Sequence, residues 1–137
     1  MTTVQLLAAP HGRLALPADP QWIRVLVPSG HPGAYLLLRH HTPFYVGRSD
    51  SCLRRRLCGH EKLAEASHLV WEPCRDPLHA YYLEAFWYDQ LSHLPSVRNL
   101  IHPARPDGND APCPFCGLDS RAVKAVLPIW PAFAEAA

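Results

Sequence analysis

This chain of 137 residues has few lysines, a net charge close to zero and no long apolar run. Only 2 of the 13 basic residues are lysine, and the formal net charge is +1. Any contact with nucleic acid would therefore depend on local positive charge rather than on a global field. No run approaches the ~20 apolar residues of a membrane span, and the N-terminus lacks the basic start and apolar stretch of a secretion signal. We therefore expect a soluble, cytoplasmic protein without a membrane partner.

The five cysteines are an odd number without a secretion signal, which argues against a disulfide framework. Cys113 and Cys116 form a C-x-x-C pair, whose spacing can place two thiolates on one tetrahedral Zn²⁺. His102 is the nearest third ligand. Candidates for the fourth ligand are Cys58, Cys74 and His93. We expect a structural zinc ion here, with free reduced thiols as the alternative.

Strand signals occupy much of the first half of the chain. Residues 22–27 (WIRVLV) are apolar and β-branched and are followed by a Pro-Ser-Gly turn, which predicts a strand. Residues 33–39 (GAYLLLR) and 44–47 (FYVG) are joined by the short segment HHTP, which predicts a β-hairpin. Residues 67–74 (SHLVWEPC) alternate loosely and predict a further strand.

Two helices are predicted between and after these strands. A Ser-Asp pair offers N-cap oxygens ahead of a first helix over residues 53–66, which Gly59 weakens in the middle. Asp76 provides the N-cap of a second helix over residues 78–93, and the proline next to it suits the first helical position. Pro95 ends that helix.

Taken in order, these elements predict an α+β fold, in which helices flank a small, mostly antiparallel sheet. The predicted order of elements in the core is ββαβα, preceded by an extra N-terminal strand. The length matches one domain, which can bury roughly two-thirds of its unfolded surface. We expect residues 1–30 to form an N-terminal extension with one strand, residues 31–101 the core, and residues 102–137 a Pro- and Cys-containing tail packed on that core.

Two short motifs lie on the predicted hairpin. GAY spans residues 33–35, YVG spans residues 45–47, and RSDSCLRRRLCGH follows. Together with Glu84 and Asn99, this ordered set resembles the GIY-YIG nuclease superfamily, although Ala34 replaces the usual Ile. The resemblance covers about half of the chain. In that family two tyrosines, an arginine, a glutamate and an asparagine form one catalytic site.

By this resemblance, Tyr35 and Tyr45 are the two tyrosines. Tyr45 is implied as the base that helps to deprotonate the attacking water, and Tyr35 positions the other groups. A phenol with a pKa of about 10 is a poor base near neutrality, so this role needs cationic charge nearby. Arginine and a metal ion are the expected sources of that charge.

Three consecutive arginines compete for the family's arginine position. The family pattern Arg-Leu-x-x-His fits Arg56 and His60, and at ~100° per residue these two share a helix face from which Arg55 points away. We therefore prefer Arg56, with Arg55 second; its implied role is to bind the scissile phosphate and stabilise transition-state charge. Flanking phosphates are expected to be bound by Arg48, Arg54 and Arg55. The alternative for the three consecutive arginines is that they form a solvent-exposed helix face without a binding role.

Three more residues complete the predicted site. Glu84 stands among aromatic residues in AYYLEAFWYDQL, and the resemblance implies that it is the single protein ligand of a Mg²⁺ or Mn²⁺ ion. An exposed glutamate on the wet side of an amphipathic helix is the alternative. Asn99 is implied to fix the active-site geometry, although alone it is an ordinary loop residue. His60 would orient a phosphate or water, or cap the end of the first helix.

These features favour a metal-dependent endonuclease that hydrolyses DNA phosphodiester bonds, with tyrosine-assisted attack by water and one divalent ion. Two alternatives stay open on the same fold: a non-catalytic nucleic-acid-binding module and a zinc-stabilised interaction domain. The residues specify neither the DNA structure that is cut nor the oligomeric state.

Overall fold

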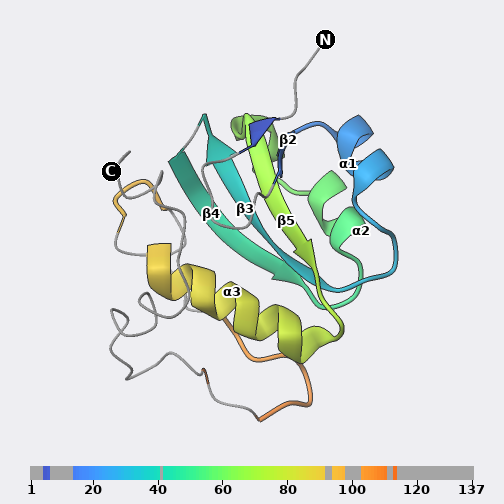
Figure 1. The fold of residues 1–137 in the computed structure, drawn as a ribbon. Coiled ribbons are helices and arrows are strands. Elements are labelled where there is room, and N and C mark those ends of the chain that lie inside the picture. The colour runs from blue at the N-terminus through green and yellow to red at the C-terminus, as the bar shows by residue number, and fades with distance from the viewer. Residues whose placement is uncertain are drawn as a thin grey trace.

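A five-stranded antiparallel sheet forms the middle of the molecule (Figure 1). The computed structural model describes residues 5–6, 14–40, 42–91, 94–97, 103–110 and 113. In spatial order the strands are β1 (Gln5–Leu6), β2 (Leu14–Pro17), β5 (His68–Pro73), β3 (Gly33–Arg39) and β4 (Thr42–Ser49). The α+β class expected from the sequence is confirmed.

Strand β3 holds the sheet together because it pairs with β4 along one edge and with β5 along the other. Six of its seven residues are buried, which explains why GAYLLLR reads as a nearly continuous apolar run rather than as an alternating one. Successive side chains of a strand point to opposite faces, so β3 contributes to two separate cores. Each core is closed by different helices.

The helices cover both faces of the sheet (Figure 1). Helices α1 (Pro20–Leu26) and α2 (Leu53–Cys58) bury their apolar side chains with those of Tyr35 and Leu37, whereas α3 (Pro77–Leu91) packs with Leu36 and Leu38 on the other face. Hydrophobic burial on two sides fixes the register of β3, because a slip of one residue would exchange the two faces. None of the helices in the described part of the chain is long and apolar enough to cross a membrane.

The strand predicted over residues 22–27 is wrong, because this segment forms α1. The Asp19 side chain accepts a hydrogen bond from the Gln21 backbone N–H at 2.9 Å, and a proline occupies the first turn. Ile23 and Val27, four residues apart, are both buried, which is helical spacing. The N-terminal extension instead contributes β1 and β2, and β2 pairs with β5.

The first predicted helix is shorter than expected. It was placed over residues 53–66, but α2 ends at Cys58, with Gly59 as its C-cap, and a 3-10 turn η1 (Leu63–Glu65) follows. The Ser49 hydroxyl accepts a hydrogen bond from the Cys52 backbone N–H at 3.1 Å, so it stabilises the turn before the helix rather than acting as the N-cap residue. Because the helix stops early, the chain can turn back toward the sheet.

Helix α3 begins where the sequence places it. The Asp76 carboxylate accepts a hydrogen bond from the His79 backbone N–H at 2.8 Å, and Pro77 is the first helical residue. The described helix ends at Leu91, and His93 lies outside the described residues.

Gly33, at the start of β3, lies where two elements approach closely. A Cβ atom added there would be 2.5 Å from the Glu72 carbonyl oxygen of β5 and 2.6 Å from Leu53 Cδ2 of α2. Neither a paired backbone nor a buried leucine can move easily, so this position accepts only a hydrogen as side chain.

We therefore expect Gly33→Ala to lower the free energy of unfolding by about 1–3 kcal/mol through overpacking. The matched control is Gly59→Ala, since Gly59 has a φ of −100° and a Cβ there meets only the Arg55 carbonyl oxygen at an ordinary 3.5 Å. Urea unfolding of both variants measures the difference. Equal losses in the two variants would contradict the packing explanation.

Candidate active site

Three rings from separate segments form a tyrosine cluster, which consists of Tyr35, Tyr45 and His60. In the register of β3 and β4, Tyr35 lies opposite Gly47 and Leu37 lies opposite Tyr45, so both tyrosines occupy the face that α1 and α2 cover. Their rings stack, with centroids 6.3 Å apart and planes inclined by 12°. The His60 ring meets both rings edge-on, at 5.4 Å from Tyr35 and 4.9 Å from Tyr45.

Gly47 makes room for this cluster. A Cβ atom at Gly47 would lie 2.5 Å from Cζ of Tyr35 and would also overlap its hydroxyl. The glycine of the YVG motif therefore has a steric function, which is to let the Tyr35 ring lie across β4. Reasoning from the sequence did not assign this role, although the paired motifs on one hairpin contained the signal.

Arg56 lies near the Tyr35 hydroxyl, and its charge acts on that group. Burial raises the pKa of Tyr35 above its ordinary value, and the Arg56 guanidinium only partly opposes this effect. Tyr35 is therefore a neutral hydroxyl at physiological pH. The Arg56 side chain is 37% exposed and also pairs with Glu61 at 3.5 Å, so it can reach solvent from the edge of the cluster.

The two neighbouring arginines have other positions. Arg55 is exposed, and its guanidinium donates to the Ser51 hydroxyl at 3.3 Å. Arg54 is half-buried, and its Nε donates to the Val27 carbonyl oxygen at 2.7 Å, which ties α2 to the end of α1. Of the three consecutive arginines, Arg56 is the one that lies against the tyrosines.

His60 lies beyond the end of α2, yet it is 95% buried in the cluster because the chain turns at Gly59. Its Nδ1 accepts a hydrogen bond from the Lys62 backbone N–H at 3.0 Å, so the proton of the neutral ring is on Nε2. Nε2 has no hydrogen-bond partner among the described residues. Burial, reinforced by the charge of Arg56, lowers the pKa of His60 below its ordinary value.

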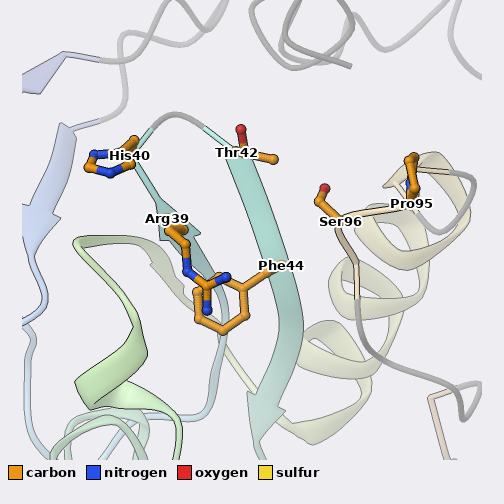
Figure 2. A pocket seen from close by; sticks show the side chains of 6 residues that line it. All are labelled: Arg39, His40, Thr42, Phe44, Pro95 and Ser96. Carbon is orange, nitrogen blue, oxygen red and sulfur yellow. The ribbon is translucent and has the colours of Figure 1, made fainter.

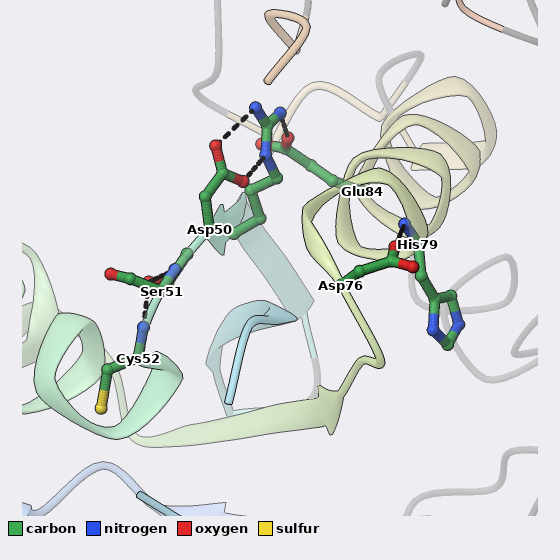
Figure 3. Close-up of polar contacts among 8 residues, drawn as sticks. Asp50, Ser51, Cys52, Asp76, His79 and Glu84 are labelled. Carbon is green, nitrogen blue, oxygen red and sulfur yellow. Dashed lines mark hydrogen bonds and ion pairs between the residues drawn. The ribbon is translucent and has the colours of Figure 1, made fainter. Parts of the chain in front are cut away.

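Glu84 of α3 lies in a second group of charges, the Arg48 bridge, which consists of Arg48, Asp50 and Glu84 (Figure 3). Arg48 Nη1 donates to Glu84 Oε1 at 2.7 Å, while Nε and Nη2 donate to the two Asp50 oxygens at 2.6 and 3.3 Å. The Arg48 guanidinium also lies over the Tyr81 ring, 5.2 Å from its centroid. Glu84 is thus a partly buried carboxylate that holds a cation.

The tyrosine cluster and the Arg48 bridge are linked by charge effects on one group, the Tyr35 hydroxyl. The charges of both Arg56 and Glu84 act on the Tyr35 hydroxyl, Arg56 favouring its ionised form and Glu84 opposing it. One region therefore collects polar side chains from β3, β4, α2, α3 and the turn after α2. The arrangement offers a carboxylate, a partly exposed guanidinium and a neutral imidazole around a buried phenol.

Other predicted site residues lie elsewhere or outside the described residues. Asn99, His102 and Cys116 are not among the described residues, and Cys113 is a half-buried free thiol. Cys58 and Cys74 are also free thiols. No group of three or more histidine, cysteine or acidic side chains suited to hold a metal occurs in the described ranges. The zinc site stays a prediction.

A separate hollow lies at the loop end of the β-hairpin (Figure 2). Arg39 covers the Phe44 ring there, 5.0 Å from its centroid, and the Ser96 hydroxyl donates to the Pro43 carbonyl oxygen at 2.8 Å. Its lining residues are Arg39, His40, Thr42, Phe44, Pro95 and Ser96. None of them belongs to the predicted site.

Comparison of the chain with protein-family models, with curated proteins and with solved structures finds no match. The resemblance to the GIY-YIG superfamily therefore stays a prediction from the motifs.

The buried Tyr35 phenol should make stability depend on alkaline pH. Because its folded-state pKa is raised, the stability it contributes is fully present below the unfolded value of about 10 and is lost as pH rises above it. We expect the wild type to lose more stability than Tyr35→Phe between pH 9 and 11, as measured by urea unfolding. Tyr82→Phe on α3 controls for the loss of a hydroxyl. Parallel profiles for wild type and Tyr35→Phe would contradict this prediction.

His60 should be neutral, with its proton on Nε2, at pH values where ordinary histidines gain charge. The lowered pKa means that its stabilising contribution is present above about 6.5, the unfolded value, and is lost as pH falls below it. Long-range ¹H–¹⁵N NMR correlations of the ring, assigned with His60→Gln, report the tautomer. An Nδ1-protonated or charged ring at pH 7 is the result that would overturn this prediction.

Proposed function

We propose that this chain is a metal-dependent endonuclease that hydrolyses DNA phosphodiester bonds. One observation supports the proposal above the others. The motifs single out Tyr35, Tyr45, Arg56 and Glu84, which come from four different elements, and the last three interact with Tyr35 by ring stacking or by charge. Packing alone does not require a carboxylate, a guanidinium and an imidazole around a buried phenol. Clusters of this kind are typical of catalytic sites.

The two tyrosines take different roles in this proposal. Tyr35 is buried and its raised pKa keeps the hydroxyl protonated, so it serves as a hydrogen-bond donor and positions its neighbours. Tyr45 is half-buried, and its side chain and that of Arg56 are close enough to interact by charge. Tyr45 is therefore the proposed base.

Arg56 and His60 provide the contacts to the phosphate and the water. The exposed part of the Arg56 guanidinium would donate to non-bridging phosphate oxygens, where negative charge accumulates in the transition state. His60 Nε2–H, which has no partner among the described residues, would donate to the attacking water or to a phosphate oxygen. The adjacent arginine, Arg55, is exposed and would contact a flanking phosphate in this proposal.

The reaction breaks one bond to phosphorus and forms another. The water oxygen attacks phosphorus as its proton passes to the deprotonated Tyr45 oxygen, and the bond to the leaving sugar oxygen breaks. That oxygen takes up a proton from solvent, and Tyr45 later returns the proton it accepted to solvent. Arg56 stabilises the charge on the phosphate oxygens throughout. Tyr35 and His60 hold the reacting groups in place by hydrogen bonds.

The donor chemistry at Glu84 fits a Mg²⁺ or Mn²⁺ ion. Such ions bind through one or two carboxylates and keep several waters and a phosphate oxygen, so a single glutamate is sufficient on the protein side. Glu84 is a partly buried carboxylate that already holds one cationic group at 2.7 Å. When bound, the ion would supply Lewis-acid stabilisation of the phosphoryl oxygens.

A non-catalytic DNA-binding module is the second candidate, and one observation favours it. The Arg48 guanidinium neutralises Glu84, as expected of a carboxylate with a structural role. Binding to DNA that weakens with salt, without cleavage in Mg²⁺ or Mn²⁺, would identify this alternative.

Cleavage assays on supercoiled, linear and single-stranded DNA with Mg²⁺ or Mn²⁺ test the proposal. We expect Arg56→Gln to lower kcat by a factor on the order of 10²–10³, as for removal of a transition-state donor, and Glu84→Gln to lower it at least as much. Arg24→Gln, an exposed position on α1, is the charge-matched control and should keep wild-type activity. Full activity in Glu84→Gln would refute the metal role of Glu84.

A further inference from the structure

In the Arg48 bridge, the positively charged Arg48 guanidinium contacts Glu84, the proposed metal ligand. Arg48 belongs to β4, Glu84 to α3, and their side chains are only 11% and 12% exposed. With little water to screen it, the pair interacts more strongly than a surface ion pair. A guanidinium stays charged at every physiological pH, so Arg48 is a permanent cation at this position.

A divalent ion bound to Glu84 would meet this guanidinium at close range. Two cations near one carboxylate repel each other, and Arg48 Nη1 already occupies Oε1 at 2.7 Å. Repulsion between the two cations would therefore weaken the contact of Arg48 with Glu84 when the ion binds. That contact in turn would lower the affinity for the ion.

Asp50 would keep the Arg48 charge paired if the contact between Arg48 and Glu84 broke. It accepts two hydrogen bonds from the opposite edge of the same guanidinium, and its own side chain is 40% exposed. When Arg48 leaves Glu84, its charge remains paired at Asp50 and near solvent. Glu84 lies on the packed helix α3 with its side chain only 12% exposed, so a cation beside it offsets the cost of burying its charge.

We propose that Arg48 is an internal counter-ion that competes with the divalent ion for Glu84, so that breaking the Arg48–Glu84 pair limits metal affinity in the free protein. This inference rests on the proposed function, in which Glu84 holds the ion. It assigns Arg48 a positioning role, in place of the phosphate contact expected from the sequence.

Isothermal titration calorimetry with Mn²⁺ alone tests the competition without any DNA or activity. We expect Arg48→Gln to bind Mn²⁺ about tenfold more tightly than the wild type, because the competing charge is gone. Arg48→Lys keeps a cation at this position and should bind Mn²⁺ within about threefold of the wild type, a difference well under 1 kcal/mol. Arg24→Gln, with the same charge change far from Glu84, should match the wild type.

Two further variants keep the test decisive. If circular dichroism shows that Arg48→Gln is unfolded, Arg48→Met retains the apolar stem over Tyr81 and replaces it in the comparison. Glu84→Gln should abolish Mn²⁺ binding both alone and combined with Arg48→Gln. If the double variant does not bind Mn²⁺ tightly, the increase in Mn²⁺ affinity caused by Arg48→Gln acts through Glu84.

The outcomes separate this inference from the proposed function. Equal or weaker Mn²⁺ binding by Arg48→Gln, with binding still dependent on Glu84, overturns the competition and leaves the metal role of Glu84 intact. Unchanged Mn²⁺ binding in Glu84→Gln, or no binding by any variant, overturns the metal role and the inference with it. Tighter binding by Arg48→Gln but not by Arg48→Lys supports both.

Discussion

The burial of β3 on both faces is the constraint on which the rest of the structure depends. A strand paired on both edges and covered on both sides has room only for side chains that fit two cores, and Tyr35 is the polar exception. Its ring requires the absence of a side chain at Gly47, and its hydroxyl requires a polar neighbour at the edge of the core. Arg56 meets the second requirement. The proposed site therefore depends on how the buried Tyr35 side chain is accommodated in the centre of the sheet.

A buried polar group needs a partner, and this also explains the charged pair that Glu84 and Arg48 form. A partly buried carboxylate such as Glu84 is stable only beside a cation or a set of hydrogen-bond donors. In the structure Arg48 is that cation, and in the proposed nuclease a metal ion takes the same role. In that proposal, structural stability and metal binding compete for one carboxylate. Asp50, which shares Arg48 with Glu84, would keep Arg48 paired in both states.

Local signals predicted much of the fold. The hairpin, the strand β5 and the start of α3 at Asp76 and Pro77 follow from β-branched runs and capping chemistry, which act between near neighbours in the chain. The strand prediction for residues 22–27 is wrong because a short apolar run fits both the strand and the helix period, and in the structure Asp19 caps a helix there. The early end of α2 depended on Gly59, whose effect a local reading underestimated.

By itself, the sequence determined which residues are available for the site and on which elements most of them lie, because side-chain periodicity within a strand or helix is a local property. It placed Tyr35 and Tyr45 on one hairpin and favoured Arg56 over Arg55 by helical phase. Only the tertiary structure decided that His60 turns back onto the tyrosines and that Glu84 is held by an arginine. Contacts between distant segments depend on the path of the whole chain and on the burial it creates, neither of which any local pattern encodes.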